Sequence, residues 1–121
     1  SVMTIKDCIN KIYPSLTAVV DGTWIEPHHI PYPDGTIGLK FPCPYCMNNF
    51  KRPSKKKEKC AVIFQGKETP SGFRPYRFKC SRCMKTSISI HQFLKEHYPL
   101  VYRDYMKENN AKKNNFKPDF S

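Results

Sequence analysis

The sequence predicts a small α+β fold in which antiparallel β-hairpins are flanked by helices. The main observation is a repeated Cys-x-x-Cys pair, first Cys43 with Cys46 and then Cys80 with Cys83. The chain between the two pairs has to leave and return if the pairs meet, and a β-hairpin is the simplest path. Apolar residues recur at helical spacing on both sides of this segment, which predicts a helix before it and helices after it.

Length and charge narrow the classes of function. The chain has 121 residues, and 21 Lys and Arg against 10 Asp and Glu give a net charge of +11. Such an excess attracts polyanions, so nucleic acid is the first expected partner, ahead of an acidic membrane surface or an acidic protein. Only 39% of the residues are hydrophobic and 11 are proline, so a metal ion would add much to the stability of a small core.

The sequence carries no usual signal for a membrane or for export. No apolar run reaches the roughly 18–20 residues that span a bilayer, and no charged start precedes an apolar stretch and a cleavage site. We therefore expect no membrane partner and an intracellular, reducing compartment. This compartment is the nucleus in a eukaryotic or nuclear-virus setting, and otherwise the cytoplasm.

A short helix is predicted over residues 4–13. Thr4 is placed as its N-cap and Asp7 as the third helical residue, a variant of the capping box. One face of the helix is apolar, with Ile5, Cys8, Ile9 and Ile12. Pro14 is expected to stop the helix, and Cys8 is expected to be a small buried hydrophobe.

Residues 17–25 predict a hairpin that turns at Asp21 and Gly22. Three prolines between positions 27 and 33 then predict an extended loop, followed by another turn at residues 33–35. The adjacent pair His28–His29 lies in this loop. Neighbouring side chains point apart, so we expect the two histidines to face solvent or to be satisfied in the core rather than to share a metal ion.

The central segment, residues 37–90, is predicted to be a ribbon of strands. Residues 37–41 form a strand leading to the first cysteine pair, residues 60–64 a second strand, and residues 75–79 a third leading to the second pair. Residues 85–88 can add another strand. Alternation predicts Arg77 and Lys79 on one face, with Tyr76 and Phe78 on the other. The basic insertion 51–59 is too repulsive to pack and is expected to be a mobile loop.

Helices are predicted at the C-terminus, over residues 91–108. Ser89 and Gln92 match a capping box, and one side of the helix that follows is formed by Ile90, Phe93, Leu94 and His97. Pro99 fits as the first residue of a second helix. The chain becomes polar from Glu108, so residues 109–121 are expected to form a flexible basic tail, while residues 1–36 are expected to pack on the ribbon.

Paired cysteines in a reducing compartment favour a metal ion over disulfides. Four thiolates at about 2.3 Å in a tetrahedron form a structural zinc site, and the two-residue gap lets each pair turn both sulfurs toward one ion. We predict a single structural zinc, worth on the order of 10 kcal/mol to folding. Its ligands are Cys43, Cys46, Cys80 and Cys83. Cys60 lies within a predicted strand and is expected to pack inward rather than to coordinate.

Other uses of the cysteines are weaker. Cys43-Pro-Tyr-Cys46 is also the motif of glutaredoxins, whose first cysteine is a low-pKa thiolate at a helix N-terminus. Here a poor helix start follows the motif, no βαβ pattern surrounds it, and the second pair would have no role. A disulfide framework would need an oxidising compartment. No nucleophile, base and acid are grouped, and no carboxylates are paired, so no catalytic residue is assigned and no enzyme activity is expected of this chain alone.

The positive charge concentrates on the ribbon. Residues 51–85 hold twelve basic and two acidic side chains, an excess of ten positive charges. Aromatic residues lie between the bases and can stack on unpaired nucleobases. The candidate contacts to nucleic acid are Lys51, Arg52, Lys55, Lys56, Lys57, Lys59, Arg74, Tyr76, Arg77, Lys79, Arg82 and Lys85. Phe78 fits the core better, Tyr76 fits either role, and the lysine run also fits a solvated loop or a nuclear-import signal.

Residues 40–106 resemble a known kind of module. Cys-Pro-x-Cys at Cys43, a hairpin and then Phe78-Lys-Cys-Ser-Arg-Cys83 are similar to the zinc ribbon at the front of bacterial and phage DNA primases. The segment from Ser89 to Pro99 looks like the helix after that ribbon, with its Phe-Leu pair. The resemblance implies a ribbon that contacts the single-stranded template while a separate domain makes the primer.

A second resemblance is to the N-terminal ribbon of some insertion-sequence transposases, carried by Arg77-Phe-Lys-Cys80 through Thr86-Ser87. Transcription-factor ribbons share the same geometry. All of them imply a zinc-dependent nucleic-acid-binding module that serves replication, transposition or transcription. DNA, including single-stranded DNA, is expected as the ligand ahead of RNA. The alternative from another class is a structural subunit that docks on protein or RNA inside a larger assembly.

Overall fold

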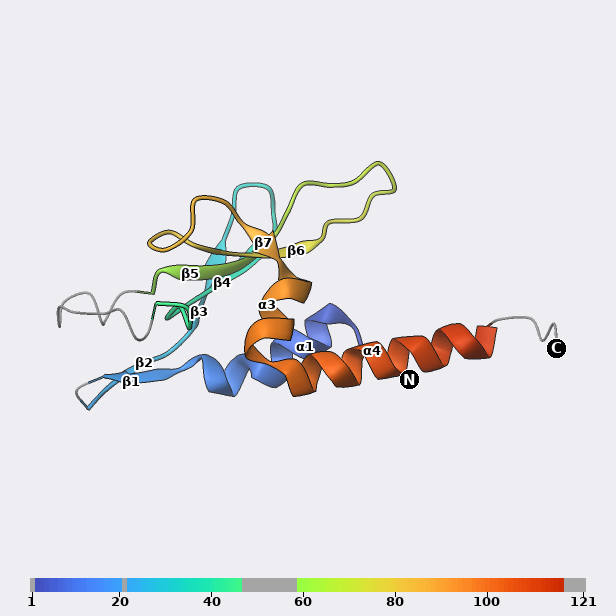
Figure 1. Cartoon of the computed structure of the whole chain (residues 1–121). Helices are drawn as coiled ribbons and strands as arrows, with labels where there is room; N and C mark the ends of the chain where they lie inside the picture. Colours follow the sequence, from blue (N-terminus) through green and yellow to red (C-terminus); the bar gives the residue numbers. More distant parts are fainter. Residues whose placement is uncertain (1, 21, 47–58, 117–121) are drawn as a thin grey trace.

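The computed structural model describes residues 2–20, 22–46 and 59–116, without the side chains of residue 20 and residues 111–116. The predicted α+β class is confirmed. A five-stranded antiparallel sheet is covered by helices on one face, and a separate two-stranded hairpin extends beside them (Figure 1). The strand order of the large sheet follows the sequence: β3 (His28–Pro31), β4 (Ile37–Phe41), β5 (Ala61–Gln65), β6 (Tyr76–Cys80) and β7 (Ile88–Ser89), so each strand pairs with its neighbour in sequence.

Helix α1, Ile5–Ile12, begins as predicted. The Thr4 side chain accepts a hydrogen bond from the backbone N–H of Asp7 (3.1 Å), and the Asp7 carboxylate accepts one from the backbone N–H of Thr4 (2.8 Å). These bonds satisfy N–H groups that the first helical turn leaves without partners. Pro14 does not end the helical structure at once, because a 3₁₀ helix, η1, continues over Tyr13–Leu16. Cys8 is fully buried, as predicted.

The predicted hairpin is confirmed as β1, Ala18–Val20, and β2, Thr23–Ile25. Val20 pairs with Thr23, and Gly22 between them has a φ of 75°, a left-handed conformation that glycine adopts without strain.

The extended loop predicted across the prolines is wrong. His28–Pro31 is a strand, β3, that pairs with β4, Ile37–Phe41, from His28 opposite Lys40 to Pro31 opposite Ile37. Strand β3 lies at the edge of the sheet, where one row of backbone groups needs no partner and a proline is therefore tolerated. The predicted turn after it is confirmed, because the backbone N–H of Gly35 donates to the carbonyl of Tyr32 (3.0 Å).

The remaining strands are β5, Ala61–Gln65, β6, Tyr76–Cys80, and β7, Ile88–Ser89. Strand β7 is shorter than the predicted strand over residues 85–88 and overlaps it only at Ile88. The guanidinium of Arg77 donates to the Ser87 hydroxyl (2.6 Å) and to the Ser87 carbonyl (3.0 Å). Just before β7, the carbonyl of Ser87 therefore accepts its hydrogen bond from the Arg77 side chain rather than from the backbone of a neighbouring strand.

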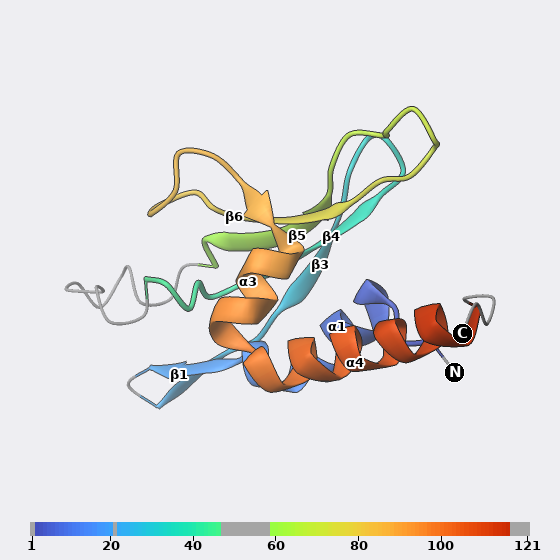
Figure 2. The same cartoon turned by 45° about the vertical axis from the view of Figure 1, so that its right-hand side comes forward.

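The two faces of the sheet differ. On the inner face, which α1 and the C-terminal helices cover, Leu39, Ile63 and Phe78 are buried. Alternation along β6 places Arg77 and Lys79 on the opposite, outer face, as predicted from the sequence. Figure 2 shows the helices gathered on one side of the sheet, with α1 beside α4, Pro99–Phe116.

An aromatic cluster joins the sheet to helix α3, Ile90–His97. The rings of Phe78 and Phe93 stack with centroids 4.3 Å apart and planes 11° apart, and Phe41 lies 5.9 Å and 6.1 Å from them. All three rings are fully buried. Ser89 caps the helix by accepting from the Gln92 backbone N–H (3.1 Å), but the Gln92 side chain turns to Glu96 instead of completing the predicted capping box.

Helix α4, Pro99–Phe116, starts at the predicted proline but runs past Glu108, where the sequence predicted a frayed tail. The Asn109 side-chain amide donates to the carbonyls of Met3 (3.0 Å) and Tyr105 (2.7 Å). This contact ties the helix to the start of the chain, which the polar composition of residues 109–116 does not reveal. Residues 117–121 of the predicted tail lie outside the described residues.

Candidate metal centre

The topology of the sheet brings the two cysteine pairs together. Strands β4 and β6 flank β5 and are both antiparallel to it, so their C-terminal ends reach the same edge. Phe41 of β4 and Cys80 of β6 pair with the same residue, Ala61. Each strand therefore delivers its Cys-x-x-Cys turn to one place.

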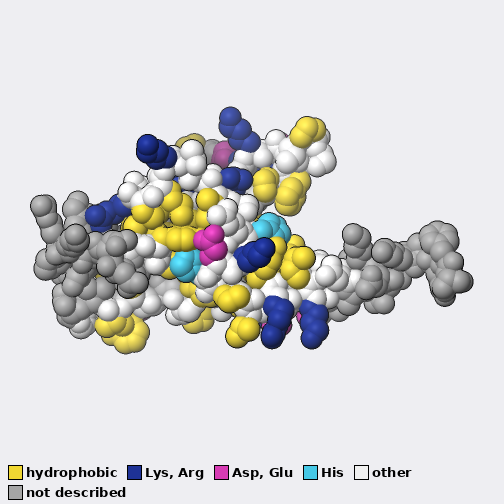
Figure 3. Space-filling view, viewed as in Figure 1, with side chains coloured by type: hydrophobic (Ala, Val, Ile, Leu, Met, Phe, Trp, Pro, Cys, Tyr) yellow, Lys and Arg dark blue, Asp and Glu magenta, His cyan; other side chains and the backbone are white. Residues whose placement is uncertain are grey.

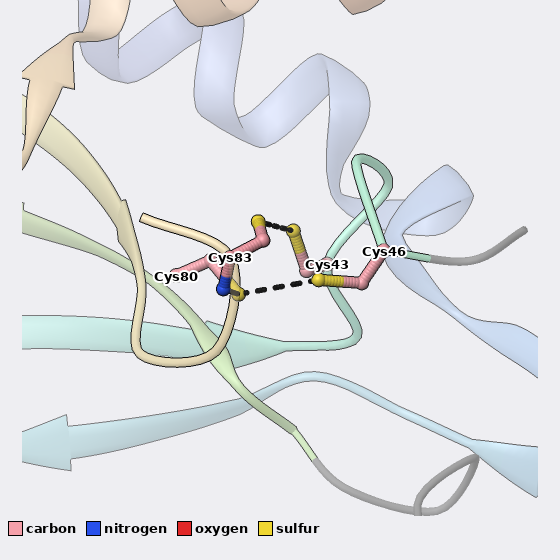
Figure 4. Close-up of side chains that lie close together, drawn as sticks. All are labelled: Cys43, Cys46, Cys80 and Cys83. Carbon is pink, nitrogen blue, oxygen red and sulfur yellow. Dashed lines mark hydrogen bonds between the residues drawn. The ribbon is translucent and has the colours of Figure 1, made fainter. Parts of the chain in front are cut away.

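The four predicted ligands form one cluster at that edge (Figure 4). Their sulfur atoms all lie within 4.8 Å of one another, with Cys43 3.8 Å from Cys83 and Cys46 3.6 Å from Cys80. A tetrahedron with metal–sulfur distances of about 2.3 Å has edges of about 3.8 Å. A disulfide would need about 2.05 Å, and all four cysteines are free. The cluster can therefore hold one metal ion.

Backbone groups shape the second turn around the sulfur of Cys80. The backbone N–H groups of Arg82 and Cys83 point to this sulfur at 3.4 and 3.5 Å. Burial raises the pKa of the Cys80 thiol, but these N–H donors, together with hydrogen bonds from the Cys83 and Cys46 thiols, favour the thiolate and bring the pKa down to about 7. Hydrogen bonds of this kind orient a metal ligand and stabilise its negative charge.

The first pair lacks the properties of a redox nucleophile. Cys43 and Cys46 are buried, and burial raises the pKa of both thiols, whereas a glutaredoxin-like motif lowers the pKa of its first cysteine. The sulfur of each cysteine in this pair also lies close to a sulfur of the other pair, Cys43 to Cys83 and Cys46 to Cys80. A cation would supply the charge that makes thiolates favourable in this setting.

Cys60 packs inward, as predicted. It is 7% exposed and precedes β5, and its carbonyl accepts from the backbone N–H of Ser81 (3.0 Å) and from the Ser81 hydroxyl (3.3 Å). Its thiol does not belong to the group of four. Cys60 thus braces the second turn through its backbone.

The predicted nucleic-acid contacts fall into separate groups. Five of them lie outside the described residues: Lys51, Arg52, Lys55, Lys56 and Lys57. Lys59 places its ammonium 3.1 Å from the His28 ring, and both histidines of the pair are exposed. Arg82 and Lys85 are exposed on and just after the second cysteine turn.

The other four divide between the faces of the sheet. Arg77 and Lys79 lie on the outer face, whereas Tyr76 packs against the core on the inner face. Arg74 forms an ion pair with Asp34 at 2.7 Å. The structure therefore groups Arg77 with Lys79 and separates both from Tyr76.

The basic and aromatic neighbours of Lys79 were not predicted from the sequence. Lys40, Val62 and Lys79 lie side by side across β4, β5 and β6, and Phe64 lies opposite Arg77 in the next row. Alternation within residues 37–41 and 61–65 was the available signal, because it places Lys40, Val62 and Phe64 on the face away from Leu39 and Ile63.

No helix within the described ranges combines the length and apolar character needed to cross a lipid bilayer. No protein-family model matches the sequence, and no curated protein matches it.

Proposed function

We propose that this protein binds one zinc ion through its four clustered cysteines and holds nucleic acid, single-stranded DNA in particular, on the outer face of its sheet. The zinc part rests on the donor set. Four thiolates at tetrahedral spacing form a closed site, typical of structural zinc, in which no open position is left for a substrate. Iron takes the same donors, so metal analysis of the purified protein decides between the two ions.

The nucleic-acid part rests on one observation, the row formed by Lys40, Val62 and Lys79 on the sheet face that no described helix covers. Neighbouring strands lie about 4.8 Å apart, so the backbones that carry the two lysines are about 10 Å apart, with an apolar side chain between them. This arrangement presents two cations to phosphates on either side of an apolar strip.

A hollow beside this row supplies aromatic surface. It has a volume of about 480 Å³. Its lining residues are Tyr32, Pro33, Asp34, Val62, Phe64, Gln65 and Lys79. Aromatic side chains next to a cation suit single strands, because unpaired bases stack on the rings while phosphates meet the charges.

The charge of the whole chain favours the same partner. The net charge is +11, and on the face shown in Figure 3 basic side chains lie on the loops beside the sheet and on α4, with few acidic groups among them. Each neutralised phosphate releases counterions, so binding should weaken steeply as salt rises.

The test is a salt titration of oligonucleotide binding by fluorescence anisotropy, with single-stranded DNA, duplex DNA and RNA of one sequence. Replacing Lys40 and Lys79 by Ala should reduce the slope of log affinity against log salt by about 1.4, since each contact to a single strand contributes about 0.7. The matched control replaces Lys11 and Lys95, which are exposed on helices, and should keep the slope. An unchanged slope in the first variant would refute the outer face as the binding surface.

From the resemblance to primase and transposase ribbons we further propose that the module serves a replication, transposition or transcription machine, where it would hold DNA while another domain carries out the chemistry. A structural subunit would behave differently in the same experiment, because it would bind oligonucleotides only with its protein or RNA partner present.

A further inference from the structure

A second cavity lies between α1 and the inner face of the sheet, at the edge opposite the cysteine cluster. Its volume is about 380 Å³. Residues from α1, η1, β3, β4, β5 and β6 border it, together with the turn before β4. The strands reach this edge at Ile37, Gln65 and Tyr76, whereas the other ends of β4 and β6 lead to the cysteines. We call this cavity the α1 cleft.

The floor and walls of the α1 cleft suit a flat ring. Leu39 and Ile63 form an apolar floor, and both are at least 95% buried. The rings of Tyr13 and His29 stack at one side with centroids 6.2 Å apart and planes 15° apart, and Tyr76 adds a third ring from β6. Ring-lined cavities of this size are typical binding sites for small planar ligands.

The polar groups of the cleft match a nucleotide. The amides of Asn10 and Gln65 line it, and neither makes a hydrogen bond to another described residue. Amide side chains pair with the edges of nucleobases through adjacent donor and acceptor atoms. Among the described residues that line the cleft, Lys6 is the only Lys or Arg and none is Asp or Glu, so the cleft favours an anionic ligand.

The α1 cleft also adjoins the outer face. Gln65 borders both the cleft and the hollow beside Lys79, because it ends β5 at the edge where the two faces meet. A nucleic-acid strand that lies across the outer face can therefore reach the cleft by passing around the C-terminal end of β5.

We propose that the α1 cleft binds one nucleobase with its phosphate, taken either from a free mononucleotide or from an unstacked nucleotide of a bound strand. In this arrangement the base lies on the rings, the amides of Asn10 and Gln65 pair with its edge, and Lys6 meets the phosphate. The strand-bound form rests on the proposed function, whereas the mononucleotide form does not.

The first experiment titrates the zinc-loaded protein with dAMP, dGMP, dCMP and dTMP, followed by amide NMR. Shifts should concentrate on residues of the α1 cleft for at least one nucleotide. Tyr13→Ala should lower the affinity for that nucleotide roughly fivefold or more, because stacking is lost. Asn10→Leu should lower it roughly threefold or more, because a hydrogen bond is lost. Asn110→Leu, an exposed change on α4, is the matched control and should leave affinity unchanged.

The second experiment uses single-stranded oligonucleotides with one 2-aminopurine. Separation of that base from its neighbours in the oligonucleotide, as it enters the cleft, should raise its fluorescence, and Asn10→Leu should cancel the rise while the salt slope set by Lys40 and Lys79 persists. One result would overturn the cleft proposal and leave the proposed function intact: the protein binds the oligonucleotides with no rise in fluorescence and binds none of the four mononucleotides. If a mononucleotide shifts the NMR signals of the cleft residues but the protein binds no oligonucleotide, the cleft proposal stands and the proposed function is refuted.

Discussion

Tyr45, inside the first cysteine turn, donates its hydroxyl hydrogen to the carboxylate of Glu96 on α3. Its ring also meets the His97 ring edge-on, with centroids 4.2 Å apart. This contact joins the first cysteine turn to a helix that starts after the second turn. The hydrogen bond lowers the pKa of the Glu96 carboxyl, since it favours the ionised form.

The first prediction tests this link. Tyr45→Phe should release zinc to a chelator faster than the unchanged protein, because the first turn loses its attachment to α3. Glu96→Gln keeps an acceptor oxygen for Tyr45 and should release zinc at nearly the original rate. The rate is measured with a colorimetric chelator in excess. Equal rates for Tyr45→Phe and the unchanged protein would show that the turn is held without this bond.

The second prediction concerns the metal itself. Native mass spectrometry should find one zinc per chain, and both chelation and Cys43→Ser should remove it and unfold the ribbon, because a structural site supplies on the order of 10 kcal/mol to folding. Cys8→Ala is the control, since Cys8 is equally buried but lies outside the cluster. It should lower stability and keep the zinc. A Cys43→Ser protein that retains a full zinc ion would contradict the four-thiolate site.

The third prediction concerns the aromatic core. Phe78→Ala should lower the free energy of unfolding of the zinc-loaded protein by about 3–5 kcal/mol, since a fully buried ring that stacks on Phe93 is replaced by a cavity. Phe73→Ala removes a ring that is 62% exposed and should change it by no more than about 0.5 kcal/mol. Urea unfolding measures both. Similar costs for the two variants would mean that the stacked rings do not form the core.

The fourth prediction concerns pH. The Thr36 hydroxyl and backbone N–H, then the Arg74 guanidinium, donate to Asp34 and lower its pKa from 3.8 to about 2. A carboxyl whose pKa is lower in the folded than in the unfolded protein stabilises the fold at any pH above the unfolded pKa. This stability is lost only as pH falls from about 3.8 toward 2. Arg74→Ala should therefore lower Tm by the same amount at pH 6, 7 and 8, measured by circular dichroism. A penalty that changed across this range would point to another titrating partner, and Lys67→Ala in the same loop is the control.

The fifth prediction concerns the lysine run outside the described residues. Replacing Lys55, Lys56 and Lys57 by Ala should lower oligonucleotide affinity and reduce the salt slope by up to about 2. Tm should stay the same, because the sequence predicts that a run of like charges does not pack. If affinity and slope both stayed constant, the run would have no part in binding.

Much of the local structure was predictable from sequence. The bonds between Thr4 and Asp7 join residues three apart, so their spacing alone indicates where α1 begins. The two-residue gap between cysteines is equally local, and it identified all four members of the cluster. The strand over residues 37–41 matched β4 because its apolar residues alternate.

Pairing between distant segments decided the rest. Composition predicted a loop where β3 lies, because the prolines signal a break and only the neighbouring strand β4 supplies the missing hydrogen bonds. In the same way, the polar residues after Glu108 continue α4, where Asn109 reaches the carbonyl of Met3.

The sequence by itself determined the α+β class, the four cysteines that cluster and the excess of positive charge. Only the tertiary structure decided that Lys40 and Lys79 flank Val62, that Tyr76 faces inward and that a ring-lined cleft separates α1 from the sheet. The physical reason is the range of the interactions involved. Caps, turns and cysteine spacings act within a few residues, whereas a shared face or cavity depends on strand register, which is fixed when strands far apart in sequence pair.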